Sequence, residues 1–275
     1  MTNVNNRKDV AGLLTRMREK APLIHNITNV VVTNFTANGL LAIGASPVMA
    51  YAKEEVEEMA TIADALVLNI GTLTADNVES MIIAGKAANA ANTPVILDPV
   101  GAGATSFRTK SIERILNNVK ISLLRGNAAE VANVAGMEAE IKGVDSVSSL
   151  EDHAVIAVHA AKKIGVSVCI TGERDVVTDG QELYYVGNGH PIMTKVTGAG
   201  CLLSSCLAAF IAVEDDVVRA SIAGLAAYGI AAEKAVNSNP AIGPGSFQAA
   251  FLDELNSISE EDINQYKKIE GSQGE

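Results

Sequence analysis

A glycine-rich turn that leads directly into an apolar helix occupies Val196 to Ser205, with the sequence VTGAGCLLSS. Gly198 and Gly200 let the backbone approach a ligand closely, and the first amides of the helix that begins near Cys201 have no intrahelical partner. These amides, with the positive end of the helix dipole behind them, favour a phosphate or the negative charge that develops during a reaction. The stretch therefore predicts an anion-binding site.

Polar residues follow four apolar runs that are typical of buried parallel strands. They are Asn69, Asp98, Arg125 with Glu130 just beyond it, and Thr171. In open parallel sheets, ligands bind outside the carboxyl ends of the strands. We therefore expect these side chains to gather at one edge of the sheet, together with the glycine turn.

The residue types at this edge match the needs of phosphoryl transfer from ATP to an alcohol. Asp98 and Glu130 are suited to Mg²⁺, either directly or through its waters. Arg125 offers a planar fork for phosphate oxygens, and Thr171 offers a hydroxyl beside a glycine. The turn at 198–201 supplies amides for the transferring charge. Together these features predict a kinase active site that uses ATP and Mg²⁺.

Each of these residues also has a purely structural interpretation. Asp98 precedes Pro99, and such an aspartate is by itself typical of a turn. Glu130 suits the first turn of a helix, and Arg125 suits a surface ion pair. The functional prediction therefore rests on their combination with the glycine turn.

Other reactive side chains lack a catalytic pattern. His153 and His159 lie six residues apart and off a common helix face, which argues against a metal pair. Ser204 and Ser205 have no G-x-S-x-G context, so acyl transfer is not supported. The three cysteines form neither a disulfide framework nor a zinc pattern, and Cys169 in VSVCI is expected to be a core residue, as is one of the other two.

Composition and charge limit the class of protein. The 275 residues are 48% hydrophobic and 19% charged, which favours one large α/β domain over residues 1–275. The net charge of -11 disfavours nucleic acid and anionic membranes as partners. The N-terminus lacks a signal-peptide core and no run of about 18 apolar residues predicts a membrane span, so we expect a cytoplasmic protein.

Short apolar runs alternate with helical patterns from Pro22 to Gly172, which predicts an α/β fold whose parallel strands are buried on both faces. Two runs around Asp179-Gly180 predict an antiparallel hairpin at the sheet edge. From Thr197 onward the pattern is mostly helical. The charged tail from Glu260 is expected to be peripheral.

The order of the motifs is informative as a whole. It comprises HNITNVVVTNFTANGLLAIGASPVMAYA, LNIGTL, VILDPVGAGAT, RGNAAE, ITGE, VTGAGCLLS and GPGSF. From about Pro22 to Phe247 the chain resembles the hydroxyethylthiazole kinase family of the ribokinase-like superfamily. The resemblance implies a ribokinase-like α/β fold, with a central, mostly parallel sheet flanked by helices on both faces. It also implies phosphorylation of the alcohol of 4-methyl-5-(2-hydroxyethyl)thiazole by Mg-ATP in thiamin salvage. It also implies a homotrimer with active sites at subunit interfaces.

Individual positions carry over from this resemblance. Arg125 and Thr171 match the family's ATP-binding positions, and Met49 in SPVMAYA and Gly198 in TGAGC match its thiazole-contacting positions. Because the chain has no tryptophan and only 4% aromatic residues, a bound ring would rest on residues such as Met49, whose polarizable thioether suits a sulfur-containing ring.

Cys201 departs from the superfamily pattern, in which an aspartate usually serves as the base for the alcohol. A thiol with a pKa of about 8.5 is a poorer proton acceptor at pH 7, although a helix N-terminus lowers that pKa and nearby phosphates raise it. Phosphoryl transfer has a loose transition state, so little base strength is needed. We hypothesise that Cys201 positions the hydroxyl and accepts its proton late.

Three other functions stay open at this point. The first is a kinase of the same fold that acts on another hydroxymethyl heterocycle, such as a pyrimidine or pyridoxal. The second is an ATP-dependent hydro-lyase on a similar scaffold. The third is a noncatalytic binding protein, which is disfavoured because the carboxylates, Arg125 and the glycine turn all lie where chemistry would need them.

Overall fold

A single sheet runs through the molecule in the order β2-β1-β3-β4-β5-β6-β7-β8-β9. The computed structural model describes residues 6–137 and 149–273. Neighbouring strands from β2 to β6 pair in parallel, and β6 to β9 pair antiparallel. The strands are β1 (Leu23–Ile27), β2 (Ser46–Val48), β3 (Ala65–Asn69), β4 (Val95–Asp98), β5 (Leu123–Gly126), β6 (Ser167–Ile170), β7 (Asp175–Thr178), β8 (Glu182–Val186) and β9 (Ile269–Gln273).

The central strands are apolar on both faces because each face packs on its own layer of helices. In β3, Ala65 and Val67 belong to one hydrophobic cluster, whereas Leu66 and Leu68 belong to the other. This alternation follows from the two-residue period of a strand. The continuous apolar run in the sequence therefore marks a strand buried on both sides, and the predicted α/β fold class is confirmed.

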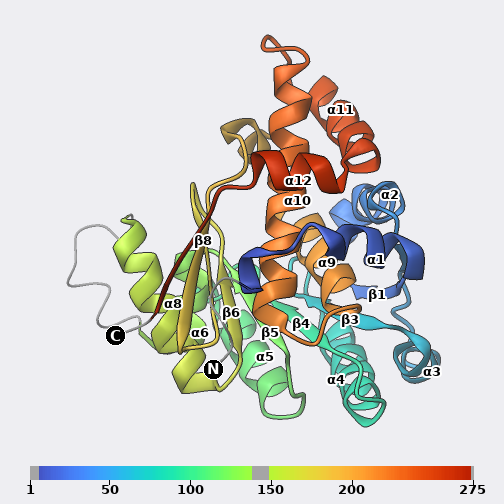
Figure 1. Ribbon diagram of the computed structural model, residues 1–275. Coiled ribbons are helices and arrows are strands. Elements are labelled where there is room, and N and C mark those ends of the chain that lie inside the picture. Colours follow the sequence, from blue (N-terminus) through green and yellow to red (C-terminus); the bar gives the residue numbers. More distant parts are fainter. Residues whose placement is uncertain (1–5, 138–148, 274–275) are drawn as a thin grey trace.

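The two helical layers enclose the sheet (Figure 1). One layer contains α1 (Gly12–Lys20), α2 (Thr33–Ile43), α9 (Ala199–Ile211), α10 (Val217–Asn237), α11 (Pro244–Ser257) and α12 (Glu260–Tyr266). The other contains α3 (Val56–Ile62), α4 (Ala75–Ala90), α5 (Ser106–Leu116), α6 (Ala128–Val134) and α8 (Leu150–Ile164). Short 3₁₀ turns are η1 (Asn6–Lys8), η2 (Val30–Val32) and η3 (Pro191–Lys195). No helix within the described ranges is both long and apolar enough to cross a bilayer.

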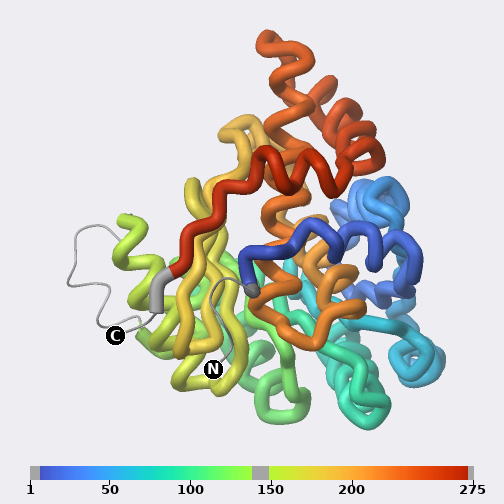
Figure 2. Tube along the Cα trace, viewed as in Figure 1, coloured from blue at the N-terminus to red at the C-terminus, as the bar shows by residue number. Residues whose placement is uncertain are grey.

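The C-terminal tail is part of the sheet, which corrects the expectation of a peripheral segment. The hairpin β7-β8 forms as predicted, but β9 pairs with β8 and takes the edge position. Figure 2 shows this red C-terminal segment running along the yellow strands. The segment IEGSQ has a single large apolar residue, so its sequence carries little strand signal. It becomes a strand because β8 offers unpaired backbone groups.

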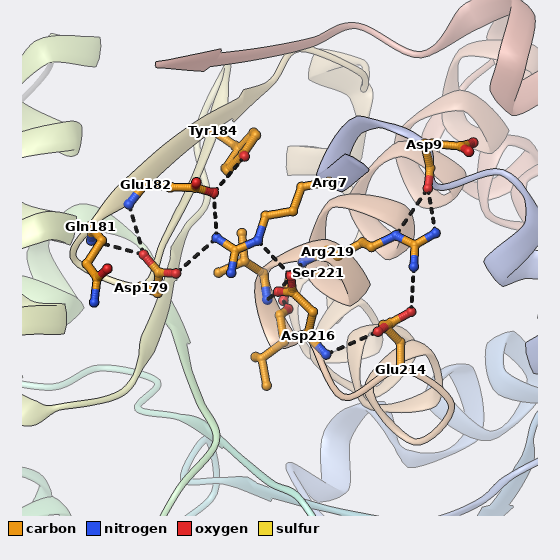
Figure 3. Close-up of polar contacts among 12 residues, drawn as sticks. Arg7, Asp9, Asp179, Gln181, Glu182, Tyr184, Glu214, Asp216, Arg219 and Ser221 are labelled. Atoms are coloured by element: carbon orange, nitrogen blue, oxygen red, sulfur yellow. Dashed lines mark hydrogen bonds and ion pairs between the residues drawn. The ribbon is translucent and has the colours of Figure 1, made fainter. Parts of the chain in front are cut away.

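Arg7 joins the N-terminal segment to the β7-β8 hairpin and to the start of α10 (Figure 3). Its Nη1 lies 2.9 Å from carboxylate oxygens of both Asp179 and Glu182, and its Nε donates to Asp216 at 2.6 Å. The Arg7 side chain is only 12% exposed. Three carboxylates therefore share one cation at a place where parts of the chain far apart in sequence meet.

Candidate active site

Asp98 lies at the centre of the polar side chains that the sequence predicted at the ends of the strands. Its carboxylate ends β4 and is fully buried. Oδ2 accepts hydrogen bonds from Nδ2 of Asn69 at 2.7 Å and from Oγ of Ser204 at 2.8 Å. Among the described residues, Oδ1 has no hydrogen-bond partner. Burial raises the pKa of Asp98, against the opposing attraction of Arg125.

Arg125 directs its guanidinium to the same place from the end of β5. Nη2 donates to Oγ1 of Thr171 at 2.7 Å, and Nη1 donates to the carbonyl of Gly200 at 3.2 Å. Nη1 also lies 3.5 Å from Oδ2 of Asp98. Burial opposes the charge of Arg125, but acidic neighbours, above all Asp98, hold its pKa above the ordinary value. Arg125 is therefore a buried cation that connects three strand ends to the first turn of α9.

The glycine turn leads into α9 as predicted. At both of its glycines, a larger residue would collide with a neighbouring side chain. Gly198 has a φ of 90°, and a Cβ there would lie 2.5 Å from Cγ1 of Val32. A Cβ on Gly200 would lie 3.0 Å from Nη1 of Arg125. Within the described ranges, the amides of Gly200 and Cys201 have no backbone acceptor. These two amides and the positive end of α9 favour an anion at this turn.

Cys201 lies in the first turn of α9 with 9% of its surface exposed. Burial, with a further contribution from the charge of Asp98, raises the pKa of the Cys201 thiol to about 11, although Asn69 acts in the opposite direction. Desolvation of the thiol is therefore the largest cause of its raised pKa. Cys201 is a neutral thiol at pH 7.

Glu130 caps α6, which is the structural interpretation that the sequence left open. Its Oε2 accepts the amide of Asn127 at 2.9 Å, in a capping box, and its Oε1 accepts the amide of Gly101 at 2.8 Å. The same carboxylate is close enough to Asp98 to raise the pKa of Asp98. Glu130 therefore supports the turn that follows Asp98, and its role at a metal stays a prediction.

Of the two carboxylates predicted to bind Mg²⁺, Asp98 is the better suited. The described residues contain no group of three or more His, Cys, Asp and Glu side chains that could hold a metal. Mg²⁺ usually binds one or two carboxylates and takes its other ligands from waters and substrate phosphates. The unpartnered Oδ1 of Asp98 is suited to that pattern, whereas both oxygens of Glu130 already accept backbone amides.

Met49 is not brought next to Asp98 within one chain. It follows β2, and two strands, β1 and β3, separate β2 from β4. At a strand spacing of roughly 4.8 Å, Met49 stands about three spacings, or ~14 Å, from Asp98 along the sheet edge. Gly198, the other predicted thiazole contact, lies beside the Asp98 group at the start of α9.

The segment 28–32 contacts both the loop that follows β3 and the start of α9. The backbone amide of Val30 donates a hydrogen bond of 3.0 Å to Oγ1 of Thr72, which follows β3. Val32 packs against the Cα of Gly198. This segment therefore borders the start of α9, and its contact with the acceptor stays a prediction.

A comparison with known families decides the assignment. The family model described as the hydroxyethylthiazole kinase family matches residues 14–261, which is most of the chain. The chain belongs to the hydroxyethylthiazole kinase family. It is thus a kinase, and it is similar along almost its whole length to a solved hydroxyethylthiazole kinase protein from Pyrococcus horikoshii OT3. The two are 42% identical with a TM-score of 0.88, over 96% of this chain and 99% of that chain.

More distant solved structures share the fold of this hydroxyethylthiazole kinase family member. Pyridoxal kinase from Staphylococcus aureus, in complex with ADP, is 17% identical with a TM-score of 0.65, over 92% of this chain and 99% of that chain. A ribokinase-like superfamily protein from Enterococcus faecalis is 12% identical with a TM-score of 0.61, over 90% of this chain and 89% of that chain. The expected ribokinase-like fold is confirmed.

Arg108 has a structural role in this kinase that no sequence pattern indicated. Its Nη1 donates to the carbonyls of Ile70 and Val100 at 2.5 and 2.6 Å, and its Nη2 donates to the carbonyl of Gly71 at 2.8 Å. Arg108 thereby ties together the loops that follow β3 and β4. A lone arginine near the start of a helix normally predicts an exposed side chain, so only the tertiary structure shows this role.

Proposed function

We propose that the protein transfers the γ-phosphoryl group of ATP to the hydroxyl of 4-methyl-5-(2-hydroxyethyl)thiazole, as part of thiamin biosynthesis. The alcohol oxygen forms a bond to the γ-phosphorus while the bond to the β–γ bridging oxygen breaks. The electron pair of that bond stays on ADP, and the proton of the alcohol is released. The observation that carries the proposal is the convergence of Asp98, Arg125 and the open amides of α9 at one sheet edge, in a chain of this family.

Arg125 and Thr171 are proposed to bind the phosphates of ATP. The guanidinium of Arg125 lies 2.7 Å from the hydroxyl of Thr171, so one nucleotide could contact both groups. The amides of Gly200 and Cys201 would donate hydrogen bonds to the transferring phosphoryl group and stabilise its negative charge. Mg²⁺, when bound, neutralises phosphate charge; Asp98 would hold it through Oδ1, and Glu130 would assist through water.

The acceptor is proposed to lie along the segment 28–32, between Met49 and Gly198. Met49 offers a polarizable surface for the thiazole ring. Cys201 stands next to the amides that face the phosphoryl group, and it would position the hydroxyl. Because the thiol is neutral at pH 7, it already carries a proton and would not take the proton of the alcohol. The loose transition state requires little base strength, so that proton would pass to a phosphoryl oxygen or to water, and the role left to Cys201 is to position the hydroxyl.

The assembly proposed for this protein is a homotrimer whose active sites lie at subunit interfaces. Val30 and Val31, on the wall of the predicted acceptor site, are 58% and 69% exposed. Adjacent exposed apolar side chains are typical of surfaces that another chain covers. Light scattering should give about three times the monomer mass of 28.6 kDa. We further propose a cytoplasmic location, where ATP is available.

The experiment that tests the function is mass detection of the product. The protein is incubated with Mg-ATP and the thiazole alcohol, and the expected result is a phosphorylated thiazole with an equal amount of ADP. Hydroxymethylpyrimidine and pyridoxal serve as competing acceptors, and Asp98→Asn serves as the control with lowered activity. Preferential phosphorylation of another acceptor, or phosphate release without a phosphorylated product, would overturn the proposal.

A further inference from the structure

The hydrogen bonds to Asp98 are distributed unequally between its two oxygens. Oδ2 accepts from Asn69 at 2.7 Å and from Ser204 at 2.8 Å, and the guanidinium of Arg125 is also nearest to Oδ2. Among the described residues, Oδ1 has no partner although it is buried. An unpartnered buried oxygen is destabilising, and nearly all such atoms in folded proteins are bonded. The asymmetry therefore points to a group from outside the chain at Oδ1.

Asn69 is oriented so that only its amino group can face Asp98. Its Oδ1 accepts the backbone amide of Gly71 at 2.9 Å, which leaves Nδ2 to donate to Asp98. Asn69 and Asp98 are also direct register partners at the ends of β3 and β4. The bond between them is thus determined by the sheet itself.

Ser204 reaches Asp98 from a different element, α9. It lies three residues after Cys201 on the same face of the helix, and it is fully buried. A buried helical serine often bonds the carbonyl four residues earlier. Ser205 makes such a contact with Cys201, whereas the hydroxyl of Ser204 is directed at Asp98. This bond connects the carboxylate to the helix whose first amides face the predicted phosphate.

We propose that Asn69 and Ser204 are positioning residues for phosphoryl transfer. By donating to Oδ2 from two sides, they prevent rotation of the carboxylate and keep Oδ1 directed at the reacting groups. Ser204 additionally sets the position of that oxygen relative to the amides at the start of α9. This inference rests on the proposed function, because the group that it orients is the one assigned to Mg-ATP.

The test compares Ser204→Ala and Asn69→Ala with Ser205→Ala as the matched control. Ser205 is also fully buried on α9, but its hydroxyl donates to Asn26 at 2.7 Å, away from Asp98. For each variant, kcat and both KM values are measured, together with thermal unfolding. The affinity for Mn²⁺ in the presence of a non-hydrolysable ATP analogue is measured by electron paramagnetic resonance. Mn²⁺ is used because its free and bound forms differ in that signal.

Loss of a group that orients a ligating carboxylate typically costs 10–100-fold in metal affinity or activity. We therefore expect S204A and N69A to lower kcat and Mn²⁺ affinity by about 10–100-fold, with the KM of the thiazole alcohol nearly unchanged. S205A should keep both values, and Ser204→Thr, which retains the hydroxyl, should recover much of the loss.

Two results would overturn the inference. One is S204A and N69A proteins that match S205A in kcat and Mn²⁺ affinity. The other is a loss of activity in all three variants that follows their loss of thermal stability. Failure of the proposed function can be told apart from failure of this inference. In the first case the unmodified protein would form no thiazole phosphate, while the Mn²⁺ measurement would still report whether Asn69 and Ser204 orient Asp98.

Discussion

The guanidinium of Arg125 donates a 2.7 Å hydrogen bond to the hydroxyl of Thr171, across two neighbouring strands. The backbone amide of Thr171 also donates to the carbonyl of Gly126 at 2.9 Å. The two residues matched to ATP-binding positions therefore form one unit, and removing the hydroxyl of Thr171 leaves a buried cation short of an acceptor.

Thr171→Val should accordingly weaken ATP binding more than it slows chemistry. A hydrogen bond to a charged group contributes about 1.5–3 kcal/mol, so we expect the KM for ATP to rise about tenfold or more. Steady-state kinetics with ATP varied at saturating thiazole alcohol measures this change. Thr171→Ser keeps the hydroxyl and should retain the original KM; an unchanged KM in both variants would remove Thr171 from the ATP site.

Asp98→Ala and Glu130→Ala should both raise the Mg²⁺ concentration needed for half-maximal activity and lower kcat. The effect should be larger for Asp98, because its Oδ1 has no hydrogen-bond partner in the part of the chain that the structure describes, whereas both oxygens of Glu130 accept hydrogen bonds from backbone amides. Glu130→Ala should also lower the free energy of unfolding by about 1 kcal/mol through loss of the capping box. Glu130→Gln, which retains an acceptor, separates the two effects. Unchanged Mg²⁺ dependence in both alanine variants would exclude both residues from the metal site.

Cys201→Asp should keep or raise turnover, and Cys201→Ala should lower turnover without abolishing it. The raised pKa of about 11 predicts that the pH profile of kcat shows no thiol ionisation between pH 6 and pH 9. It also predicts slow alkylation by iodoacetamide at pH 7, since the thiolate is the reactive form. A C201D protein that binds both substrates but transfers no phosphate would contradict the proposed role.

Arg7→Gln should destabilise the protein at neutral pH by about 1–3 kcal/mol, because three carboxylates lose their shared cation. Although burial acts to raise it, the pKa of Asp179 is held below its usual value by the backbone amides of Glu182 and Gln181 and by Arg7. A lowered pKa in the folded state contributes stability above the unfolded-state pKa, near 4, and that contribution is lost as the pH falls.

The difference in the free energy of unfolding between wild type and R7Q should therefore shrink from pH 7 toward pH 3. Urea unfolding at several pH values measures it, with Arg16→Gln as the control. The half-exposed Arg16 pairs with Glu214, and an ion pair with one exposed partner should contribute about 0–1 kcal/mol. A difference that stays constant with pH would argue against the ion pairs as its source.

Much of the fold was predictable because buried parallel strands have a strong local pattern. The runs around β3, β4, β5 and β6 are apolar on both faces, and each ends in a polar residue. The position of β9 was not predictable, since its sequence has no such pattern and its pairing depends on β8. Likewise, the role of Arg108 depends on carbonyls from two distant loops.

The amino-acid sequence by itself determined which side chains meet at the sheet edge. Parallel strands end on the same side, so Asp98, Arg125 and Thr171 had to be neighbours once the strands were recognised. Tertiary structure alone decided how those side chains are used. Only in the folded chain do both oxygens of Glu130 accept hydrogen bonds from backbone amides. Folding also buries the thiol of Cys201 and brings the donors of Asn69 and Ser204 to one oxygen of Asp98. Hydrogen bonds and desolvation depend on atoms far apart in sequence, and no local pattern specifies them.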